Sequence, residues 1–483
     1  MEPRPPLNVL WIMCDELRAD AISAYGNSHP EIQTPNIDRL AQAGVLFESS
    51  YTACPVCVPA RTSLATGRLP DETGVWGNEA YGDGAHSIAP NLVTFTEVLA
   101  AAGWSTLDFG KEHLPPSISP WQSQDPAGSD MAELVHGVRE AGGKIVRTSG
   151  MRFAVAGTWP GTVPYPPSKI TENAIAAMAE ADGPFIVRAS YLQPHTPVIV
   201  PEPWASRYAD VDFAESPAHE GGTSRFEARF AEINGGHVMD PADFQQAQVA
   251  YHGAVSWLDD QVGRLLGALE RLRLADSTVI VLTADHGAHL GEDGAYGKHT
   301  FAPQSHRVPL IVVDPHRAAP GTRRSDLAHG TDIARTVLAS CGVDAPEQIG
   351  GRDLLRDPAP EMIISAIGYG AAESRAFPNR GIGTGAEGGG WPQRFCARTR
   401  RYRLDITTRI DGIPATREQQ DVFLADTLND PEERYNVAGD PRYEGVREWL
   451  RTAILERSGR AFQPDDTDVY KAFAPPAATP SAS

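Results

Sequence analysis

A cysteine at the start of a predicted helix is the first feature of this sequence that could do covalent chemistry. Cys57 opens the stretch Cys-Val-Pro-Ala-Arg, in which Pro59 suits the first turn of a helix that stops at Gly67. Backbone N–H groups at the start of a helix attract anions, and Arg61 lies one helical turn beyond Cys57 on the same face. The sequence therefore predicts an anion-handling site around Cys57.

The same segment leaves two other interpretations open. Cys54 and Cys57 form a Cys-x-x-Cys pair, which can be a redox-active dithiol or half of a zinc site. A zinc site would need a second cysteine pair, which the sequence lacks, and a redox pair would leave Arg61 without a role. The chain has only five cysteines in 483 residues, an odd and sparse set that does not indicate a disulfide framework.

Acidic residues follow two apolar runs that are predicted to be buried strands. Asp15 and Glu16 come directly after the first apolar run of the chain. Asp285 and His286 come directly after the β-branched run of residues 276–284. Taken singly, each pair could consist of ordinary loop residues that cap helices. Ligands of α/β proteins collect beyond the carboxyl ends of the strands, so the two pairs together favour a divalent cation site.

A framework of alternating strands and helices must position these residues. Strands are predicted from continuous apolar runs, at residues 7–14, 185–191, 276–284 and 308–313. Helices are predicted from periodic apolar residues with cap and stop signals, at residues 35–43, 95–102 and 244–274. This alternation indicates an α/β fold, with a large, mostly parallel central sheet flanked by helices.

The pattern changes after about residue 355. Residues 361–367 fit a last strand of the main sheet, short strands without intervening helices are predicted at 395–406 and 420–424, and a helix is predicted at 444–456. We therefore expect a smaller antiparallel α+β domain near the C-terminus. The expected boundaries are 1–360 for the large domain, 361–460 for the small one and 461–483 for a tail rich in Pro, Ala and Ser. The Gly-rich residues 381–390 are expected to form a mobile loop.

The composition is that of a globular protein with excess acid, 41% hydrophobic and 22% charged, with a net charge of -20. This charge argues against a nucleic-acid binder and against a polybasic membrane surface. No apolar run approaches the roughly 18 residues of a membrane-spanning helix. Residues 7–14 could belong to a short signal peptide, but Asp15 and Glu16 follow at once, which favours a buried strand. The expected compartment is the cytoplasm.

Several motifs in a fixed order resemble those of the sulfatase family, within the alkaline-phosphatase-like superfamily. Residues 57–61 resemble the Cys-x-Pro-x-Arg sequence at which a maturation enzyme oxidises the cysteine of that family to formylglycine. Further segments match in order along the chain, namely Asp15, 17–20, 34–40, 110–114, 193–197, 285–287, 290–291, Lys298, 307–310 and 421–436. The resemblance covers about residues 7–455 and implies the alkaline-phosphatase-like fold, with a catalytic large domain.

Two positions depart from the family pattern. Many members have a second Asp where this chain has Glu16, and Asn is common in place of His286. The Asp-His version is found in choline and iduronate sulfatases and in phosphonate monoester hydrolases, so it does not decide the reaction. A phosphonate monoester or phosphodiester hydrolase with the same site is therefore the alternative. A metal-binding protein whose Cys57 is never matured is the alternative outside enzymes.

The resemblance implies a metal-assisted covalent reaction. The expected cofactors are one divalent cation, Ca2+ first and Mn2+ or Mg2+ as alternatives, and formylglycine at Cys57. The implied ligands are the formylglycine hydrate together with Asp15, Glu16, Asp285 and His286. A thiolate is a weak nucleophile toward sulfur(VI), whereas a hydroxyl of the hydrate could attack sulfur and form a covalent sulfo-enzyme. The second hydroxyl would then lose its proton, and sulfate would leave as the aldehyde re-forms.

The resemblance also implies roles for the basic residues. Arg61 would stabilise the formylglycine hydrate, and Lys111 and Lys298 would contact the sulfate oxygens. The chain has only five lysines, and these two fall in family motifs. His195 resembles the acid that protonates the leaving oxygen, and His113 resembles the base that acts on the second hydroxyl.

Substrate and partners are less well defined by the sequence. Asn78 is a further candidate for a substrate contact. The expected substrate is a small anionic sulfate ester of unspecified alcohol, and Trp121, Trp159 and Trp204 could line its pocket or simply pack in the interior. The expected protein partner is the formylglycine-generating maturation enzyme. The sequence also allows a homo-oligomer, because the tail could reach a neighbouring subunit.

Overall fold

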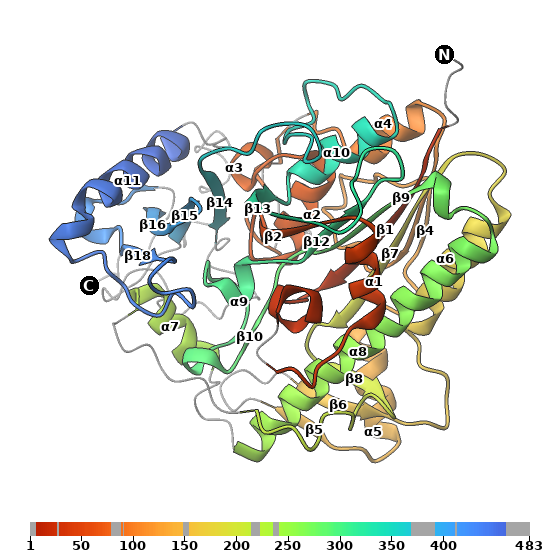
Figure 1. The fold of residues 1–483 in the computed structure, drawn as a ribbon. Coiled ribbons are helices and arrows are strands. Elements are labelled where there is room, and N and C mark those ends of the chain that lie inside the picture. The colour runs from red at the N-terminus through yellow and green to blue at the C-terminus, as the bar shows by residue number, and fades with distance from the viewer. Residues whose placement is uncertain are drawn as a thin grey trace, which may run out of the picture.

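An eight-stranded, mostly parallel sheet forms the centre of the structure, which is a computed structural model (Figure 1). The structure describes residues 6–26, 29–78, 88–89, 91–147, 154–213, 223–234, 241–368, 392–410 and 413–459. The strands of the large sheet lie in the order β13 (Thr322–His329), β2 (Val45–Tyr51), β12 (Leu310–Val313), β9 (Thr278–Ala284), β1 (Asn8–Asp15), β7 (Phe185–Pro194), β3 (Ser105–Gly110) and β4 (Ser123–Asp125). The predicted α/β fold is confirmed.

Strand β12 departs from the parallel arrangement. It runs antiparallel to both of its neighbours, β9 and β2, whereas the other neighbouring pairs of the large sheet are parallel. Its partner β9 precedes it in the chain, and residues 285–309 between them return without a crossover helix long enough to cover the sheet. A parallel neighbour would need such a crossover, so the antiparallel pairing follows from this connection.

Each face of the large sheet is covered by a layer of helices. Leu10 and Ile12 of β1 point to one face, which is covered by α1 (Pro35–Ala43), α6 (Ser168–Glu180) and α8 (Pro241–Arg271). Trp11 and Met13 point to the other, covered by α2 (Cys57–Thr66), α4 (Phe95–Ala101) and α10 (Asp332–Ser340). Burial on both faces explains why these strands are continuous apolar runs. The predicted helices correspond to α1, α4 and α8, and the helix expected after Cys57 is α2.

A second, antiparallel sheet lies beside the large one. It consists of β14 (Ile363–Gly368), β15 (Pro392–Arg398), β16 (Tyr402–Ile410) and β17 (Ile413–Pro414), with β18 (Phe423–Asp426) paired to β16. The helix α11 (Glu444–Gly459) packs on it through Leu450 and Ile454. The assignment of residues 361–367 to the main sheet is wrong, because β14 pairs antiparallel with β15. The strand predicted at 395–406 is in fact a hairpin of β15 and β16.

The remaining elements are short. They are a three-stranded sheet of β5 (Ile145–Arg147), β6 (Ala154–Trp159) and β8 (Val198–Pro201), a hairpin of β10 (His289–Leu290) and β11 (Tyr296–Gly297), and the helices α3 (Pro70–Thr73), α5 (Met131–Glu140), α7 (Arg225–Asn234) and α9 (Pro303–His306). The loop expected at 381–390 and the tail expected at 461–483 lie outside the described residues. The domain boundaries stay a prediction.

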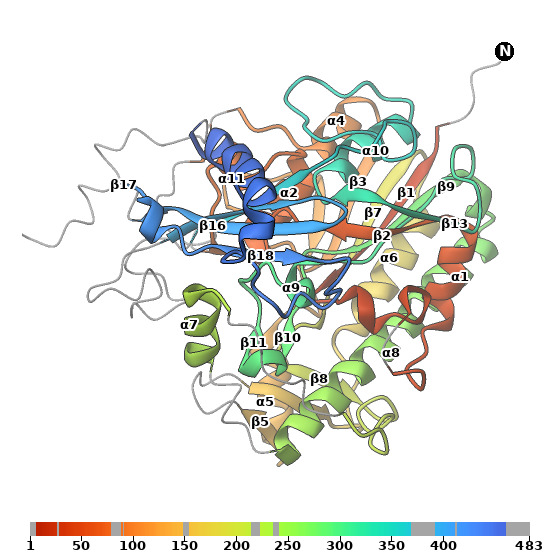
Figure 2. The ribbon, with the colours of Figure 1, turned by 60° about the vertical axis from the view of Figure 1, so that its left-hand side comes forward.

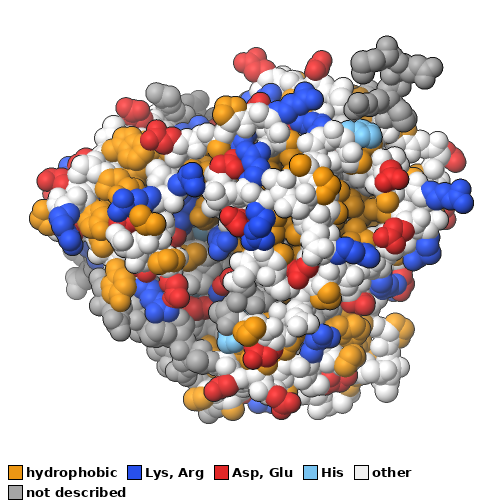
Figure 3. Space-filling model, in the orientation of Figure 1, with side chains coloured by type: hydrophobic (Ala, Val, Ile, Leu, Met, Phe, Trp, Pro, Cys, Tyr) orange, Lys and Arg blue, Asp and Glu red, His pale blue; other side chains and the backbone are white. Residues whose placement is uncertain are grey.

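The surface carries charges of both signs. Acidic and basic side chains are intermixed on the face that Figure 3 shows, so the net charge of -20 is not gathered there into one acidic field. Within the part of the chain that the structure describes, none of the helices combines the length and the hydrophobicity that crossing a bilayer requires.

Candidate active site

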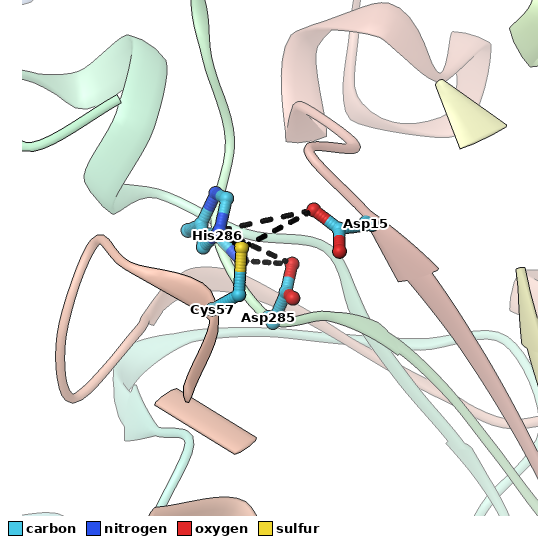
Figure 4. Close-up of side chains that lie close together, drawn as sticks. All are labelled: Asp15, Cys57, Asp285 and His286. Atoms are coloured by element: carbon cyan, nitrogen blue, oxygen red, sulfur yellow. Dashed lines mark hydrogen bonds and ion pairs between the residues drawn. The ribbon is translucent and has the colours of Figure 1, made fainter. Parts of the chain in front are cut away.

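Four buried side chains converge where β1 ends, α2 begins and β9 ends (Figure 4). They are Asp15, Cys57, Asp285 and His286, and each offers one ligand atom within 4.8 Å of the others. The Sγ atom of Cys57 lies 3.2 Å from Nε2 of His286 and 3.8 Å from Oδ1 of Asp15. Nε2 of His286 lies 3.6 Å from Oδ1 of Asp285. The residue pairs that follow the two strands thus meet at Cys57.

This donor set suits a divalent cation. Its two carboxylates are the ligands that Ca2+, Mg2+ and Mn2+ prefer, whereas an imidazole is a more typical ligand of transition metals. Although burial disfavours a charged imidazole, Asp285 holds the pKa of His286 at about 9, so the cluster attracts positive charge. Burial raises the pKa of Asp285, and the nearby charge of Asp15 raises it further. A cation among these groups would relieve that repulsion, so the donor set fits a divalent cation, and the identity of the ion stays a prediction.

The guanidinium of Arg61 binds the carboxylates of this cluster. Its Nε donates to Oδ2 of Asp285 at 2.8 Å, and its Nη2 donates to Oδ2 of Asp15 at 3.1 Å. Its Nη1 donates to the backbone carbonyl of Lys111 at 2.5 Å. The sequence led us to expect that Arg61 acts on the group formed from Cys57. In the structure its hydrogen bonds hold two carboxylates of the donor set, Asp15 and Asp285, and its expected action on the group formed from Cys57 stays a prediction.

Two lysine ammonium groups contact the cluster. Nζ of Lys298 lies 2.9 Å from Sγ of Cys57, and Nζ of Lys111 lies 3.8 Å from it and donates to Asp15. Although burial opposes a charged thiolate, Lys111, Lys298 and His286 hold the pKa of Cys57 well below its ordinary value. The position of Sγ is therefore a place where negative charge is stabilised, and the same ammonium groups could bind substrate oxygens.

Glu16 belongs to a second group of candidate ligands, with Asp15 and His195. Its Oε1 lies 2.9 Å from Nζ of Lys298 and 3.3 Å from Nε2 of His195. Its Oε2 accepts a hydrogen bond from the backbone of Thr196 at 3.3 Å. The structure thus places Glu16 between the two groups expected to contact the substrate, outside the four-residue cluster. Its assignment as a metal ligand stays a prediction.

The last two candidates, His113 and Asn78, differ in their surroundings. Burial lowers the pKa of His113 to about 4, although its hydrogen bond with Cys57 acts in the opposite direction. The imidazole is therefore neutral at pH 7 and able to accept a proton.

Oδ1 of Asn78 accepts a hydrogen bond from the backbone of Val58 at 3.0 Å, in the first turn of α2. Asn78 thus caps the helix that carries Cys57, and its expected contact with the substrate stays a prediction.

Two hydroxyl groups that we did not single out in the sequence hold the backbone of the site. Oγ of Ser190 donates to the carbonyl of Lys111 at 2.6 Å and accepts from Nη1 of Arg61 at 3.1 Å. Oγ1 of Thr52 donates to the carbonyl of Asp285 at 2.5 Å. A polar residue in the buried strand β7 is a signal that could have identified Ser190. Thr52 has no comparable signal, because its partner is far away in the sequence.

A buried cluster of two histidines and a serine adjoins Thr52. Oγ of Ser365 donates to the carbonyl of Thr52 at 2.8 Å. The same Oγ lies 2.8 Å from Nε2 of His306 and 3.1 Å from Nε2 of His329. Ser365 belongs to β14, so the cluster connects the small sheet to the site. Burial lowers the pKa of His329 to about 4 and that of His306 well below its ordinary value.

The neutral His329 makes the folded state sensitive to acid. Because the pKa is about 4 in the folded protein and about 6.5 in the unfolded chain, unfolding takes up a proton between these values. The contribution of the neutral His329 to the free energy of unfolding is present at pH 7, and it falls as the pH drops below about 6.5. We expect His329 to account for a loss of about 2 kcal/mol in the free energy of unfolding between pH 7 and pH 5.

Urea unfolding of the His329→Gln variant at both pH values tests this expectation. The variant should lose about 2 kcal/mol less than the wild type between pH 7 and pH 5. His316→Gln, which replaces an exposed histidine, serves as the matched control and should behave like the wild type. Equal pH dependence in all three proteins would show that His329 is not the acid-sensitive group.

Comparisons with known proteins identify relatives of this chain. The family model described as Sulfatase matches residues 7–343. Iduronate 2-sulfatase of Mus musculus is 32% identical over 342 residues, which are 65% of this chain and 60% of that protein. The match thus spans less than two thirds of the length of that relative.

Solved structures share the fold at lower identity. BT4656, solved in complex with its substrate D-glucosamine-2-N,6-O-disulfate, has a TM-score of 0.72 at 22% identity, over 96% of this chain and 100% of that one. The phosphonate monoester hydrolase of Agrobacterium radiobacter has a TM-score of 0.74 at 21% identity, over 94% of this chain and 96% of that one. At this level of identity the similarity shows a common fold.

Proposed function

Since the chain belongs to the sulfatase family, we propose that it hydrolyses sulfate monoesters of a small alcohol. One observation carries this proposal. Lys298 reaches within 2.9 Å of Sγ of Cys57, at the point where Asp15, Asp285 and His286 form a metal-type donor set. The similarity to iduronate 2-sulfatase and to BT4656, whose substrate is a sulfated sugar, supports the proposal.

Two groups would complete the site. Asp15, Asp285 and His286 would hold a divalent cation, for which we propose Ca2+, with Mn2+ and Mg2+ as alternatives. When bound, the cation supplies Lewis acidity that lowers the pKa of an oxygen nucleophile and neutralises substrate oxygens. Oxidation of Cys57 to formylglycine by a maturation enzyme would supply an oxygen nucleophile, which suits sulfur(VI) better than a thiolate does.

The remaining chemistry belongs to side chains of the chain itself. Lys111 and Lys298 would bind the sulfate oxygens and neutralise the charge that grows on them. Nε2 of His195 would donate a proton to the leaving oxygen, and it is held by Glu16 at 3.3 Å and by Lys298 at 3.0 Å. His113, neutral at pH 7, would take a proton from the nucleophilic residue. These groups act in a buried site, where charge stabilisation is stronger than in water.

A comparison of two chromogenic substrates tests the reaction class. After co-expression with a competent maturation enzyme, kcat/KM would be measured for an aryl sulfate and for an aryl phosphonate monoester. We expect the sulfate to be the better substrate. A phosphonate preference of several orders of magnitude would assign the site to phosphonate ester hydrolysis instead. If peptide mapping finds Cys57 still a thiol after co-expression, the enzymatic proposal fails and a metal-binding protein is favoured.

The cytoplasmic location and the homo-oligomer remain proposals that rest on the sequence. The assignment of residues 7–14 to a buried strand supports the first. Measurement of the molecular mass in solution would decide the second.

A further inference from the structure

The helix α7 links the small sheet to the active site, and Figure 2 shows it beside the hairpin of β10 and β11. Its first turn is capped by Asp421, which precedes β18 in the chain. Oδ1 of Asp421 accepts from the backbone N–H of Arg225 at 2.9 Å, and Oδ2 accepts from that of Phe226 at 2.8 Å. First-turn N–H groups have no partner within their own helix, so a carboxylate that accepts from two of them is a strong, charge-assisted cap.

Buried charges strengthen this attachment of α7 to the small sheet. Nη1 of Arg394 donates to Oδ2 of Asp421 at 3.2 Å, and the guanidinium lies 4.8 Å from the ring centre of Phe226. Nη2 of Arg403 donates to Oε1 of Glu227 at 2.6 Å. Both arginines are fully buried, where an ion pair that loses one partner leaves an uncompensated charge. The position of α7 is therefore coupled to the small sheet.

The other side of α7 packs against the loops of the active site. The ring of Phe230 is 1% exposed, and its centre lies 6.0 Å from the ring centres of His289 and His299. The backbone N–H of His299, the residue after Lys298, donates to the carbonyl of Pro55 at 3.1 Å. Phe230 belongs to one apolar cluster that joins three parts of the chain to α7. The other members are Cys54 and Val56 before residue 57, Ala295 and Phe301 around Lys298, Ile367 and Cys396 of the small sheet, and Phe226 of α7 itself.

We propose that Asp421 is a positioning residue for the active site. Through α7 and Phe230, it fixes the loop of Lys298 against the loop that precedes residue 57. The distance between Nζ of Lys298 and residue 57 is then set partly by the small sheet. The kinetic consequence rests on the proposed sulfatase function, whereas the structural coupling does not. Misplacement of a catalytic group by about 1 Å can cost about 10²-fold in rate, so a weakened cap should be measurable.

A double-mutant cycle measures the coupling in kinetics. We expect Asp421→Asn to lower kcat/KM for an aryl sulfate about tenfold in the wild type and less than about twofold in Lys298→Ala, because the effect passes through Lys298. The matched control is Asp440→Asn, which removes a carboxylate that caps a short surface helix of the same region, accepting from Arg442 at 2.9 Å. It should leave kcat/KM unchanged. An equal loss from Asp421→Asn in both backgrounds would overturn the proposal.

Hydrogen exchange tests the coupling without any activity. In Asp421→Asn, and in Phe230→Leu where the cap is intact, we expect faster amide exchange in residues 295–301 and unchanged exchange in the central strand β1. Asp440→Asn should show neither change. Unaltered exchange at 295–301 in both variants would overturn the proposal even if activity falls. Faster exchange in a protein without sulfatase activity would uphold the coupling and reject the proposed function.

Discussion

Replacement of Cys57 by alanine is expected to lower kcat for sulfate ester hydrolysis by roughly 10⁴-fold or more, as loss of a covalent nucleophile does in other hydrolases. Alanine cannot be converted to formylglycine, so the site loses the residue that lies between Lys298 and the metal-type ligands. The fold should survive, because alanine is a good helix former and Cys57 opens α2. Turnover of an aryl sulfate and the melting temperature check the two parts of this prediction.

Cys54→Ala is the matched control for this experiment. Cys54 lies in the same loop and is also buried, but it is not among the donor atoms of the cluster. We expect it to retain most of the wild-type activity. Equal, complete loss in both variants would favour a dithiol, and near-normal turnover by Cys57→Ala would remove residue 57 from the mechanism.

Asp285→Asn should give the second large effect, the loss of the bound divalent ion. A cation contributes several kcal/mol of transition-state stabilisation, so we expect kcat/KM to fall by about 10³-fold. Asparagine keeps the shape of Asp285 and one acceptor for Arg61, which limits damage to the fold. Metal content after dialysis is the direct measurement. The melting temperature of the wild type should rise with added Ca2+, since the proposed ion would stabilise the folded state by binding it, and that of the variant should not.

Two further variants make this result specific. Asp108→Asn removes a buried carboxylate that pairs with Arg188 at 2.7 Å, away from the donor set, and should leave the metal content unchanged. His286→Asn replaces one ligand by another side chain with a donor atom and should weaken metal binding less than Asp285→Asn does. A full equivalent of metal retained by Asp285→Asn with wild-type affinity would show that the cation lies elsewhere.

The strands and the helix that carry the site could be predicted from the sequence. A strand buried on both faces is a continuous apolar run, and Pro59 and Gly67 mark the two ends of a helix, so β1, β9 and α2 were predictable from short windows. The carboxyl ends of parallel strands share one edge, so the meeting of Asp15 with Asp285 followed as well. Each of these features depends on neighbours within a few residues, or on a general rule of sheet topology.

The tertiary structure alone decided which partner each polar group takes. Arg61 binds two carboxylates, Asn78 caps α2, and Glu16 turns toward Lys298, although residue types alone allow other partners. The placement of β12 and β14 has the same cause, because strand pairing depends on which connections return over a sheet. Most buried polar groups are hydrogen-bonded, and which distant residue serves as the partner of each one is fixed only when the whole core packs. The link from Asp421 to Lys298 is of this kind, and no local pattern contains it.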